Sequence, residues 1–275
     1  STAEGLGAEV EVYVANSNAQ KQFEQAEEAL AAGADILVLV AADASKVGPI
    51  LKAAQAENVP VLAYDRLLPH EDISLYLSFD NQMVGKLQAE YALKAHPKGK
   101  YAIVCGPKRD FNSLLYRKGQ YEAIEPKIKA GDIELVYDEY MGEWAEMEGY
   151  MAAAELLAMN PEVDVILAAN DALASGVIMA LEEYQKTGKV FVSGQDASLD
   201  GIQMLIDGKV HVNIYKPIKK LAKRAAETAV KIANGEDIPD KETLKFQGKK
   251  IPSILLEVIP VTQDNYKETV VKDGH

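Results

Sequence analysis

Short apolar runs rich in β-branched residues alternate with longer amphipathic segments along nearly the whole chain. The short runs have the length and composition of buried strands, and the longer segments carry apolar residues three and four positions apart, which is the helical period. Strands that alternate with helices in this way form parallel sheets with helices on both faces. The pattern therefore predicts an α/β protein.

The predicted elements fall into two successive series, which indicates two lobes. In the first series we expect strands over residues 10–15, 36–40, 59–63, 75–79 and 101–104, and helices near 19–32, 44–57 and 81–95. In the second we expect strands over 133–137, 163–168, 190–193 and 210–214, and helices near 113–130, 145–158, 171–186 and 198–206. The length of 275 residues also fits two lobes of about 100 to 150 residues each.

Three places are expected to carry the chain from one lobe to the other. Gly106-Pro107 ends the first series and Lys216-Pro217 ends the second, and the proline suits the first turn of a helix predicted over 218–233. A strand over 254–260 makes the third crossing, and residues 265–272 are expected as one more strand or edge segment. We therefore predict two doubly wound parallel-sheet lobes joined by a three-strand hinge. The expected first lobe holds residues 1–105 and 217–257, and the second holds residues 106–216 and 258–275.

Charge and composition limit the classes of molecule that the protein is expected to bind. With 42 acidic and 29 basic side chains the net charge is -13, which repels nucleic-acid phosphates and anionic lipid at long range. No run approaches the roughly 20 apolar residues that span a bilayer. The single cysteine, Cys105, is expected in the core. Residues 1–8 resemble the tail of a helix followed at once by a strand, so we expect that an upstream segment has been removed.

Polar side chains follow five of the predicted strands. They are Asp65-Arg66, Asp110 with Asn112, Asn170-Asp171, Gln195-Asp196 and Lys216. In an open parallel sheet the carboxyl ends of the strands border the ligand crevice, so we expect these groups to converge. Carboxylates accept from neighbouring hydroxyls and a guanidinium donates in a fork. The groups therefore predict a site for one small, hydroxyl-rich molecule.

Each candidate also has a simpler interpretation. Asp65 and Arg66 could form a local ion pair, and Asn112 and Asn170 could be helix N-caps. Arg117, near the start of a predicted helix, could be a solvated side chain.

The same holds for the remaining candidates. Ser198 is available to cap the helix that follows Gln195-Asp196, and Lys216 could be a solvated charge. Trp144 would by default be buried in the core. It lies, however, in a polar stretch between a strand and a helix, where its ring can stack on the apolar face of a pyranose.

Several runs taken together resemble the xylose-binding proteins of bacterial sugar ABC importers, and the resemblance extends from Ala3 over essentially the whole chain. The runs are Leu62-Ala-Tyr-Asp65-Arg66, Ser78-Phe-Asp-Asn81 with Val84-Gly85, Tyr116-Arg117-Lys-Gly119-Gln120, Ala169-Asn170-Asp171-Ala172, Ser193-Gly-Gln195-Asp196-Ala197 with Gly201-Ile202, Tyr215-Lys216-Pro217 and Val270-Val271-Lys272-Asp273-Gly274. The resemblance implies a type I periplasmic binding protein that holds a monosaccharide, D-xylose above all, in the cleft between its lobes. It implies hydrogen bonds to the sugar from Asp65, Arg66, Asn112, Arg117, Asn170, Asp196 and Lys216, with Gln195 close by and Trp144 stacked on the ring.

The resemblance also implies partners and a location. The closed form would be presented to an ABC permease or, in some relatives, to the extracellular domain of a sensor kinase. The protein would be periplasmic or extracellular, and lipid-anchored in a Gram-positive cell. No catalytic residue, metal or cofactor is implied.

One departure from the family pattern concerns the first lobe. Family members begin with a strand and a helix start that supply a lysine, an arginine and an aromatic stacking partner, and this chain has no such segment. We therefore hypothesise that its first lobe takes a strand from elsewhere: a second chain, another copy, or a rearranged segment of its own.

Two other classes of function would require features that can be compared with this sequence. An enzyme is not expected, because the chain has no Gly-x-Ser-x-Gly turn, no Gly-Lys-Ser/Thr phosphate loop and only four histidines. Paired carboxylates for glycoside cleavage stay open at this stage. The effector domain of a transcription regulator would need a DNA-reading helix-turn-helix and a basic face, and the sequence shows neither.

Overall fold

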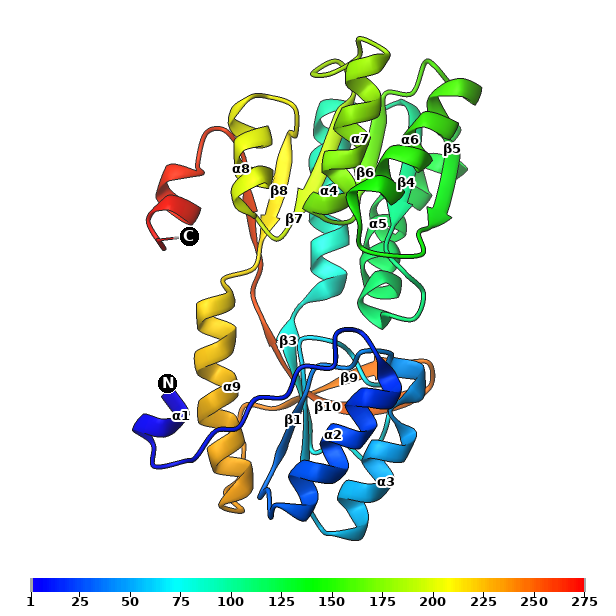
Figure 1. Ribbon diagram of the computed structural model, residues 1–275. Helices are drawn as coiled ribbons and strands as arrows, with labels where there is room; N and C mark the ends of the chain where they lie inside the picture. The colour runs from blue at the N-terminus through cyan, green and yellow to red at the C-terminus, as the bar shows by residue number, and fades with distance from the viewer. Residues whose placement is uncertain (1, 275) are drawn as a thin grey trace. The chain divides into compact units, whose positions relative to one another are not determined.

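The computed structural model describes residues 2–274, which form two compact units (Figure 1). Unit 1 contains the residues up to 79, residues 109–111 and residues 217–256. Unit 2 contains residues 80–108, residues 112–216 and the residues from 257 onward.

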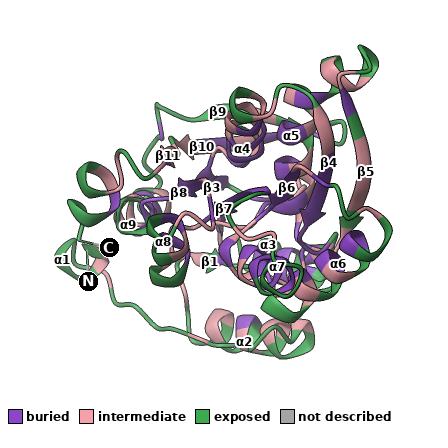
Figure 2. Cartoon of the chain, turned by 90° about the horizontal axis from the view of Figure 1, so that it is seen from above, coloured by how far each residue is buried: buried purple, intermediate pink, exposed green. Residues whose placement is uncertain are grey.

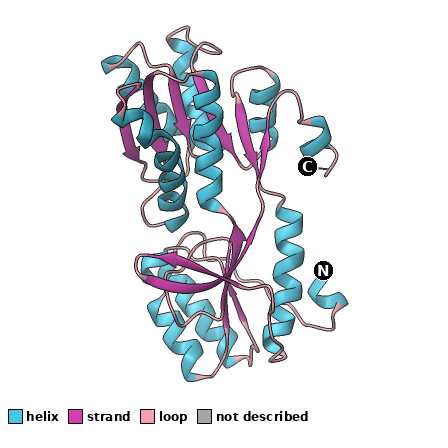
Figure 3. Ribbon diagram, turned by 180° about the vertical axis from the view of Figure 1, so that it is seen from behind, coloured by secondary structure: helices cyan, strands magenta, loops and turns pink. Residues whose placement is uncertain are grey.

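Unit 1 is built on a five-stranded sheet with the order β1-β2-β3-β10-β9. Strands β1 (Leu37–Leu39), β2 (Val61–Tyr64), β3 (Leu75–Phe79) and β10 (Lys249–Leu256) run parallel, and β9 (Glu242–Phe246) pairs with β10 in the antiparallel sense. The helices are α1 (Thr2–Gly5), α2 (Ala19–Ala31), α3 (Gly48–Ala56) and α9 (Ile218–Ala233), with the short 3-10 helix η1 (Ala44–Lys46). In Figures 1 and 3, α9 lies on one side of this sheet and α2 and α3 on the other. Both faces are thus covered, which explains why every residue of β3 is buried.

Unit 2 is built on a six-stranded sheet with the order β11-β8-β7-β6-β4-β5. Strands β4 (Gly99–Cys105), β5 (Ile133–Tyr140), β6 (Val165–Ala168), β7 (Phe191–Gln195) and β8 (Val212–Tyr215) are parallel, and β11 (Ile259–Val261) is antiparallel to β8. The other elements are α4 (Asn81–Ala95), α5 (Phe111–Lys129), α6 (Glu146–Met159), α7 (Asp171–Glu183), α8 (Leu199–Ile206) and the π-helix η2 (Lys267–Val271). Figure 2 shows the buried residues concentrated in the strands, and exposed residues along the outer sides of the helices. The strand order reverses between β4 and β6, so this sheet has a topological switch point.

The α/β fold with parallel sheets in two units is confirmed. The helices predicted over 81–95 and 218–233 have those bounds in α4 and α9. Toward the end of the chain one expectation is wrong and one element was not predicted. Residues 267–271 form a π-helix rather than a strand, and β9 had no predicted counterpart.

The strand predicted over 10–15 is also wrong. These residues carry no strand pairing, and Val10, Val12 and Val14 are 48%, 79% and 60% exposed. The neighbouring β1 pairs only with β2 among the described residues, and its Val38 is 48% exposed. Apolar alternation produces a strand only where an adjacent strand supplies hydrogen-bond partners, and here that partner is missing from the described residues.

The predicted boundary between the lobes at Gly106-Pro107 needs a correction, because residues 80–105 belong to unit 2 rather than to the first lobe. Strand β4 pairs with β5 and β6, and α4 packs on the strands β6, β7 and β8. The chain therefore leaves unit 1 between Phe79 and Asp80. Gly106 instead serves packing inside unit 2, since a Cβ there would lie 2.1 Å from the Trp144 ring atom Cη2.

Candidate functional site

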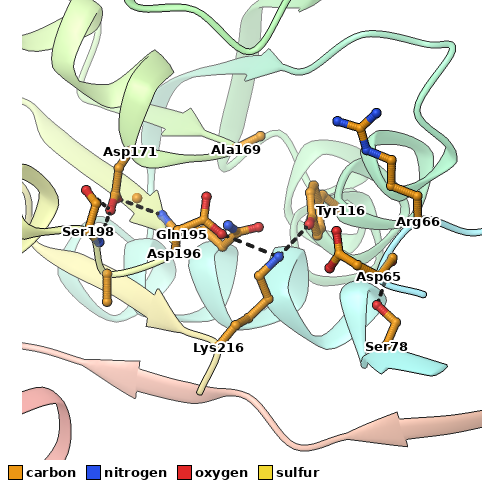
Figure 4. A network of polar contacts seen from close by, with 12 residues as sticks. Asp65, Arg66, Ser78, Tyr116, Ala169, Asp171, Gln195, Asp196, Ser198 and Lys216 are labelled. Atoms are coloured by element: carbon orange, nitrogen blue, oxygen red, sulfur yellow. Dashed lines mark hydrogen bonds and ion pairs between the residues drawn. The ribbon is translucent and has the colours of Figure 1, made fainter. Parts of the chain in front are cut away.

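Asp65 of unit 1 occupies a tight turn directly after β2. Its φ of 61° is left-handed, a conformation that Asp tolerates better than most residues. The Asp65 N–H donates to the Leu77 carbonyl at 2.9 Å, and its carbonyl oxygen accepts from the Ser78 hydroxyl at 2.7 Å (Figure 4). Both partners belong to β3, so the sheet itself fixes Asp65 at the carboxyl end of β2.

Arg66 is held by groups other than its neighbour in sequence. Its Nη1 donates to the Ala41 carbonyl at 2.8 Å, and its Nε lies 3.3 Å from Asp110 Oδ2. The Asp110 side chain is only 7% exposed, so this ion pair is largely shielded from water. Arg66 is therefore positioned by Asp110 and by the loop after β1, and its side chain keeps 30% of its surface exposed.

In unit 2, Lys216 is a buried cation at the end of β8. Its side chain is 6% exposed, and its Nζ lies 3.4 Å from Asp196 Oδ1, which belongs to the turn after β7. The same Nζ donates to the Tyr116 hydroxyl at 3.2 Å (Figure 4). The alternative of a solvated lysine is thus wrong. A buried ammonium needs such partners, because an unpaired one is strongly unfavourable.

Trp144 joins this group through Tyr116. The two rings meet edge to face, with centroids 6.1 Å apart and an interplanar angle of 68°. The carboxylate of Asp196, the ammonium of Lys216 and the rings of Tyr116 and Trp144 therefore form one continuous chain of contacts from four separate segments. Tyr116 was not predicted as a site residue, although it lies four residues after Asn112 and so shares a helix face with it.

Asn112 and Asn170 follow the two strands that flank the switch point. Asn112 is 3% exposed in the first turn of α5. Asn170 is the N-cap of α7, and its Oδ1 accepts from the Leu173 N–H at 3.0 Å. The capping interpretation of Asn170 is therefore confirmed, and the role of its amide toward a ligand stays a prediction. Switch points are where open α/β sheets bind ligands.

Arg117 is engaged by an acidic partner. Its Nε donates to Asp138 Oδ1 at 2.7 Å, and Nη2 pairs with the other oxygen of the same carboxylate. The guanidinium also lies over the rings of Tyr121 and Tyr140, at 4.7 and 5.1 Å from their centroids. The hydrogen bonds and charge of Asp138 raise the pKa of Arg117 above its usual value. The Nε and Nη2 groups of Arg117 are thus already hydrogen-bonded to Asp138.

A layer of buried polar side chains supports the ends of β6 and β7. Gln88 of α4 donates from Nε2 to the carbonyls of Ala168 and Gly194, both at 3.1 Å, and accepts from Gln120 Nε2 at 2.9 Å. These bonds tie α4 and α5 to the carboxyl ends of two strands. These bonds are not predictable from the sequence, because a glutamine in an amphipathic helix is usually a surface residue.

Gln195 and Asp171 lie at the same edge and are both buried, at 2% and 5% exposure. The Gln195 Oε1 atom has no hydrogen-bond partner among the residues that the structure describes. Burial, and next the charge of Asp196, raise the pKa of Asp171 to about 7, although hydrogen bonds from Ser198 and Asn213 act in the opposite direction. A buried acceptor without a partner is unfavourable and marks a place for an added donor.

A hollow in the surface of unit 2 lies apart from the predicted site residues. A hollow along β5, lined among others by Leu135, Tyr137 and Met159, contains none of the predicted site residues. Within residues 2–274, no three His, Cys, Asp or Glu side chains gather as a metal site would require. Over the same residues, no helix combines the length and apolar character needed to span a bilayer.

Comparisons with known proteins identify the family to which the chain belongs. A family model described as "Periplasmic binding protein domain" matches residues 1–237. The D-xylose-binding periplasmic protein of Escherichia coli (strain K12) is 40% identical over 274 residues, which is 99% of this chain and 83% of that protein. The corresponding protein of Haemophilus influenzae is 39% identical over 273 residues, covering 99% of this chain and 82% of its own length.

A solved structure shows the same fold. An ABC transporter solute binding protein from Clostridium phytofermentans, crystallised with bound β-D-glucose, superposes with a TM-score of 0.89 at 26% identity and covers 98% of this chain and 90% of its own. The chain therefore belongs to the periplasmic binding protein family.

Proposed function

We propose that this chain is a receptor for a monosaccharide, D-xylose in the first place, and that it serves an ABC importer. The observation that carries the proposal is the continuous contact from Asp196 through Lys216 and Tyr116 to Trp144. It joins an anionic acceptor, a cationic donor and an aromatic face, which are the groups that recognise a pyranose. The 40% identity to a protein named for D-xylose binding supports the choice of sugar.

Each proposed contact has a defined chemical role. Asp196, whose side chain is 43% exposed, accepts hydrogen bonds from two adjacent sugar hydroxyls, and Lys216 donates to a hydroxyl or the ring oxygen. Trp144 stacks on the apolar face of the ring. The unpartnered Oε1 of Gln195 receives a further hydroxyl hydrogen.

The amides and the groups of unit 1 complete the proposed set. Asn112, Asn170 and Arg117 contribute from unit 2, and Asp65 and Arg66 contribute from unit 1. A sugar that binds groups of both units increases the population of the conformation in which all of those groups reach it. The larger population of this loaded conformation is the signal. Micromolar affinity corresponds to about -8 kcal/mol, which a few charge-assisted hydrogen bonds and one stacked ring can supply.

Titration calorimetry of the purified chain tests the proposal directly. D-xylose, D-ribose, D-glucose and D-galactose are injected separately, and we expect saturable heat with the tightest binding for D-xylose. NMR spectra of the sugar after long incubation should show it unchanged, since the relatives are binding proteins rather than enzymes. Absence of binding for all four sugars would refute the proposal, and a chemically altered sugar would refute the receptor role.

The downstream partner and the location belong to the same proposal. We propose export from the cytoplasm, with a lipid anchor if the cell is Gram-positive, and delivery of the sugar to the permease. A sensor kinase domain is the alternative reader of the loaded form. Reconstituted permease whose ATPase rate rises only with loaded receptor supports delivery, and a loaded receptor that leaves that rate unchanged excludes it.

We also propose that unit 1 takes up one more strand from a second polypeptide segment. The supporting observations are the outer edge of β1, which has no partner strand among the described residues, and the three exposed valines at 10, 12 and 14. Unpaired strand edges with apolar side chains are templates for strand addition. In the isolated monomer we expect the amides of β1 and β2 to exchange faster than those of β6. Equal protection of β2 and β6 would contradict this.

A further inference from the structure

The turn that carries Asp196 has an unfavourable backbone. Asp196 has a φ of 98° and Ala197 a φ of 54°, so two successive residues with a Cβ lie in the left-handed half of conformational space. Such conformations persist only where the surroundings hold them, and they cluster at functional sites. The turn comprises residues 195–198, and its surroundings must therefore hold it in this conformation.

Two buried side chains bind the N–H groups of the turn. Asp171 Oδ1 accepts from the Gln195 N–H at 3.1 Å, and Oδ2 accepts from the N–H and the hydroxyl of Ser198 at 2.8 and 2.9 Å (Figure 4). Asn213 Oδ1 accepts from the Ala197 N–H at 2.9 Å. The fourth N–H, that of Asp196, donates to the Ile214 carbonyl at 3.1 Å. Every N–H group of the turn therefore has a partner.

The two side chains are built into the end of the sheet. Asp171 and Asn213 are 5% and 0% exposed, and Asn213 Nδ2 donates to Asp171 Oδ1 at 2.5 Å. Gly201 makes room for this arrangement, because a Cβ there would lie 2.0 Å from Asp171 Oδ2. Any side chain at 201 would push the carboxylate away from the turn.

We infer that Asp171, oriented by Asn213, is a positioning residue that holds the turn at 195–198 so that the Asp196 carboxylate stays beside Lys216 and ready for the sugar. The inference rests on the proposed function and goes beyond it, because Asp171 faces the protein and reaches the sugar only through Asp196. Asp171 faces the protein interior, and this inference gives it a function that its neighbour Asn170 does not have.

The ionised form of Asp171 suits this task. The groups that face its carboxylate are N–H donors, apart from the Ser198 hydroxyl, which can also accept. A proton on Oδ1 would therefore meet only donors, and a proton on Oδ2 could be donated only to Ser198. The charged group that acts on Asp171 is Asp196 in the turn, and Asp196 is itself paired with Lys216. With the pKa of Asp171 raised to about 7, we expect the sugar affinity to fall as the pH decreases from 8 to 6.

The variant Asp171→Asn tests the inference by calorimetry with D-xylose at pH 6 and pH 8. Either orientation of the new amide places its NH₂ group against an N–H of the turn, so we expect at least about tenfold weaker binding at pH 8, equivalent to the loss of roughly one hydrogen bond to a charged group. The difference in affinity between the two pH values should shrink. The double variant Asp171→Asn with Asn213→Asp restores one carboxylate and the bond between the two side chains, and should recover part of the affinity. Asp200→Asn, an exposed change in the first turn of α8, is the matched control and should bind like the parent.

Amide exchange in the sugar-free protein gives a second readout. In Asp171→Asn the amides of Gln195, Ala197 and Ser198 should exchange faster, whereas those of β6 should keep their protection. Unchanged affinity together with unchanged protection of the turn would overturn the inference. Loss of protection throughout unit 2 would also overturn it, because Asp171 would then support the fold as a whole. If the parent binds no sugar, the proposed function fails, and the exchange of the turn still decides whether Asp171 holds it.

Discussion

Replacing Lys216 by methionine should weaken sugar binding while leaving the fold almost unaffected. Lys216 is 6% exposed, and methionine keeps most of its apolar stem while removing the charge. Removing one partner of a buried ion pair is usually strongly destabilising, because the other charge stays buried without compensation. Here the partner, Asp196, is 43% exposed and can be hydrated instead. We therefore expect the free energy of unfolding to change by no more than about 1 kcal/mol.

The expected effect on binding is larger. A hydrogen bond from a charged donor contributes about 1.5 to 3 kcal/mol, so Lys216→Met should raise the dissociation constant for D-xylose about 10- to 150-fold. Calorimetry measures the affinity, and urea unfolding followed by circular dichroism measures the stability. The control is Lys118→Met, an exposed change on α5 of the same unit, which should alter neither quantity. Unchanged affinity together with a loss of more than about 3 kcal/mol of stability would show that Lys216 is a structural residue and would refute this reasoning.

Three further predictions follow from the same geometry. Asp196→Ala should weaken D-xylose binding by about 1.5 to 3 kcal/mol, and unchanged calorimetric affinity would remove Asp196 from the site. Gly106→Ala places a Cβ 2.1 Å from the ring of Trp144, the only tryptophan, so the fluorescence maximum should shift and binding should weaken; an unshifted spectrum would contradict the packing. The pKa of Asp171 is about 7 in the folded protein against an ordinary value of 3.8, so its contribution to stability is full below pH 3.8 and is lost as the pH rises to 7. The free energy of unfolding should therefore fall over that range, and by less in Asp171→Asn; equal slopes would show that Asp171 titrates normally.

Element boundaries were predictable where local chemistry fixes them. Helix α4 begins where it was predicted because Asp80 caps it, accepting from the Met83 N–H at 2.9 Å. Helix α9 follows Pro217 and ends before Asn234-Gly235, and both signals act within a few residues. Such features are visible in the sequence because their physical cause is local.

The failures share the opposite property. Whether residues 10–15 form a strand depends on an adjacent strand, and whether Gly106-Pro107 joins two lobes depends on which strands β4 pairs with. Neither partner is encoded nearby. A Gly-Pro pair marks a turn, and the pairing of β4 with β5 and β6 decides in which unit that turn lies.

The site shows the same division. Residues that follow strands could be predicted, because the carboxyl ends of parallel strands have a known position. Asn213 and Gln88 could not, since one lies inside a strand and the other inside a helix, where the period predicts only whether a residue faces the core. Their partners are 42 and 106 positions away, in Asp171 and Gly194. The supporting layer of the site is therefore a property of the tertiary structure.

Two charged groups at this edge reduce stability in return for a defined geometry. Lys216 is a buried cation paired with Asp196, which is 43% exposed, and Asp171 is a buried anion whose pKa lies far above its ordinary value. An apolar side chain at 216 would avoid the unfavourable desolvation of a charge. At 171 the same gain would be offset, because the N–H groups of Gln195 and Ser198 would lose their acceptor. What the charges provide is direction: Lys216 orients Asp196 from one side, and Asp171 orients its backbone from the other. If Lys216→Met and Asp171→Asn both proved more stable than the parent and bound sugar more weakly, the stability lost through these charges could be attributed to ligand recognition rather than to the fold.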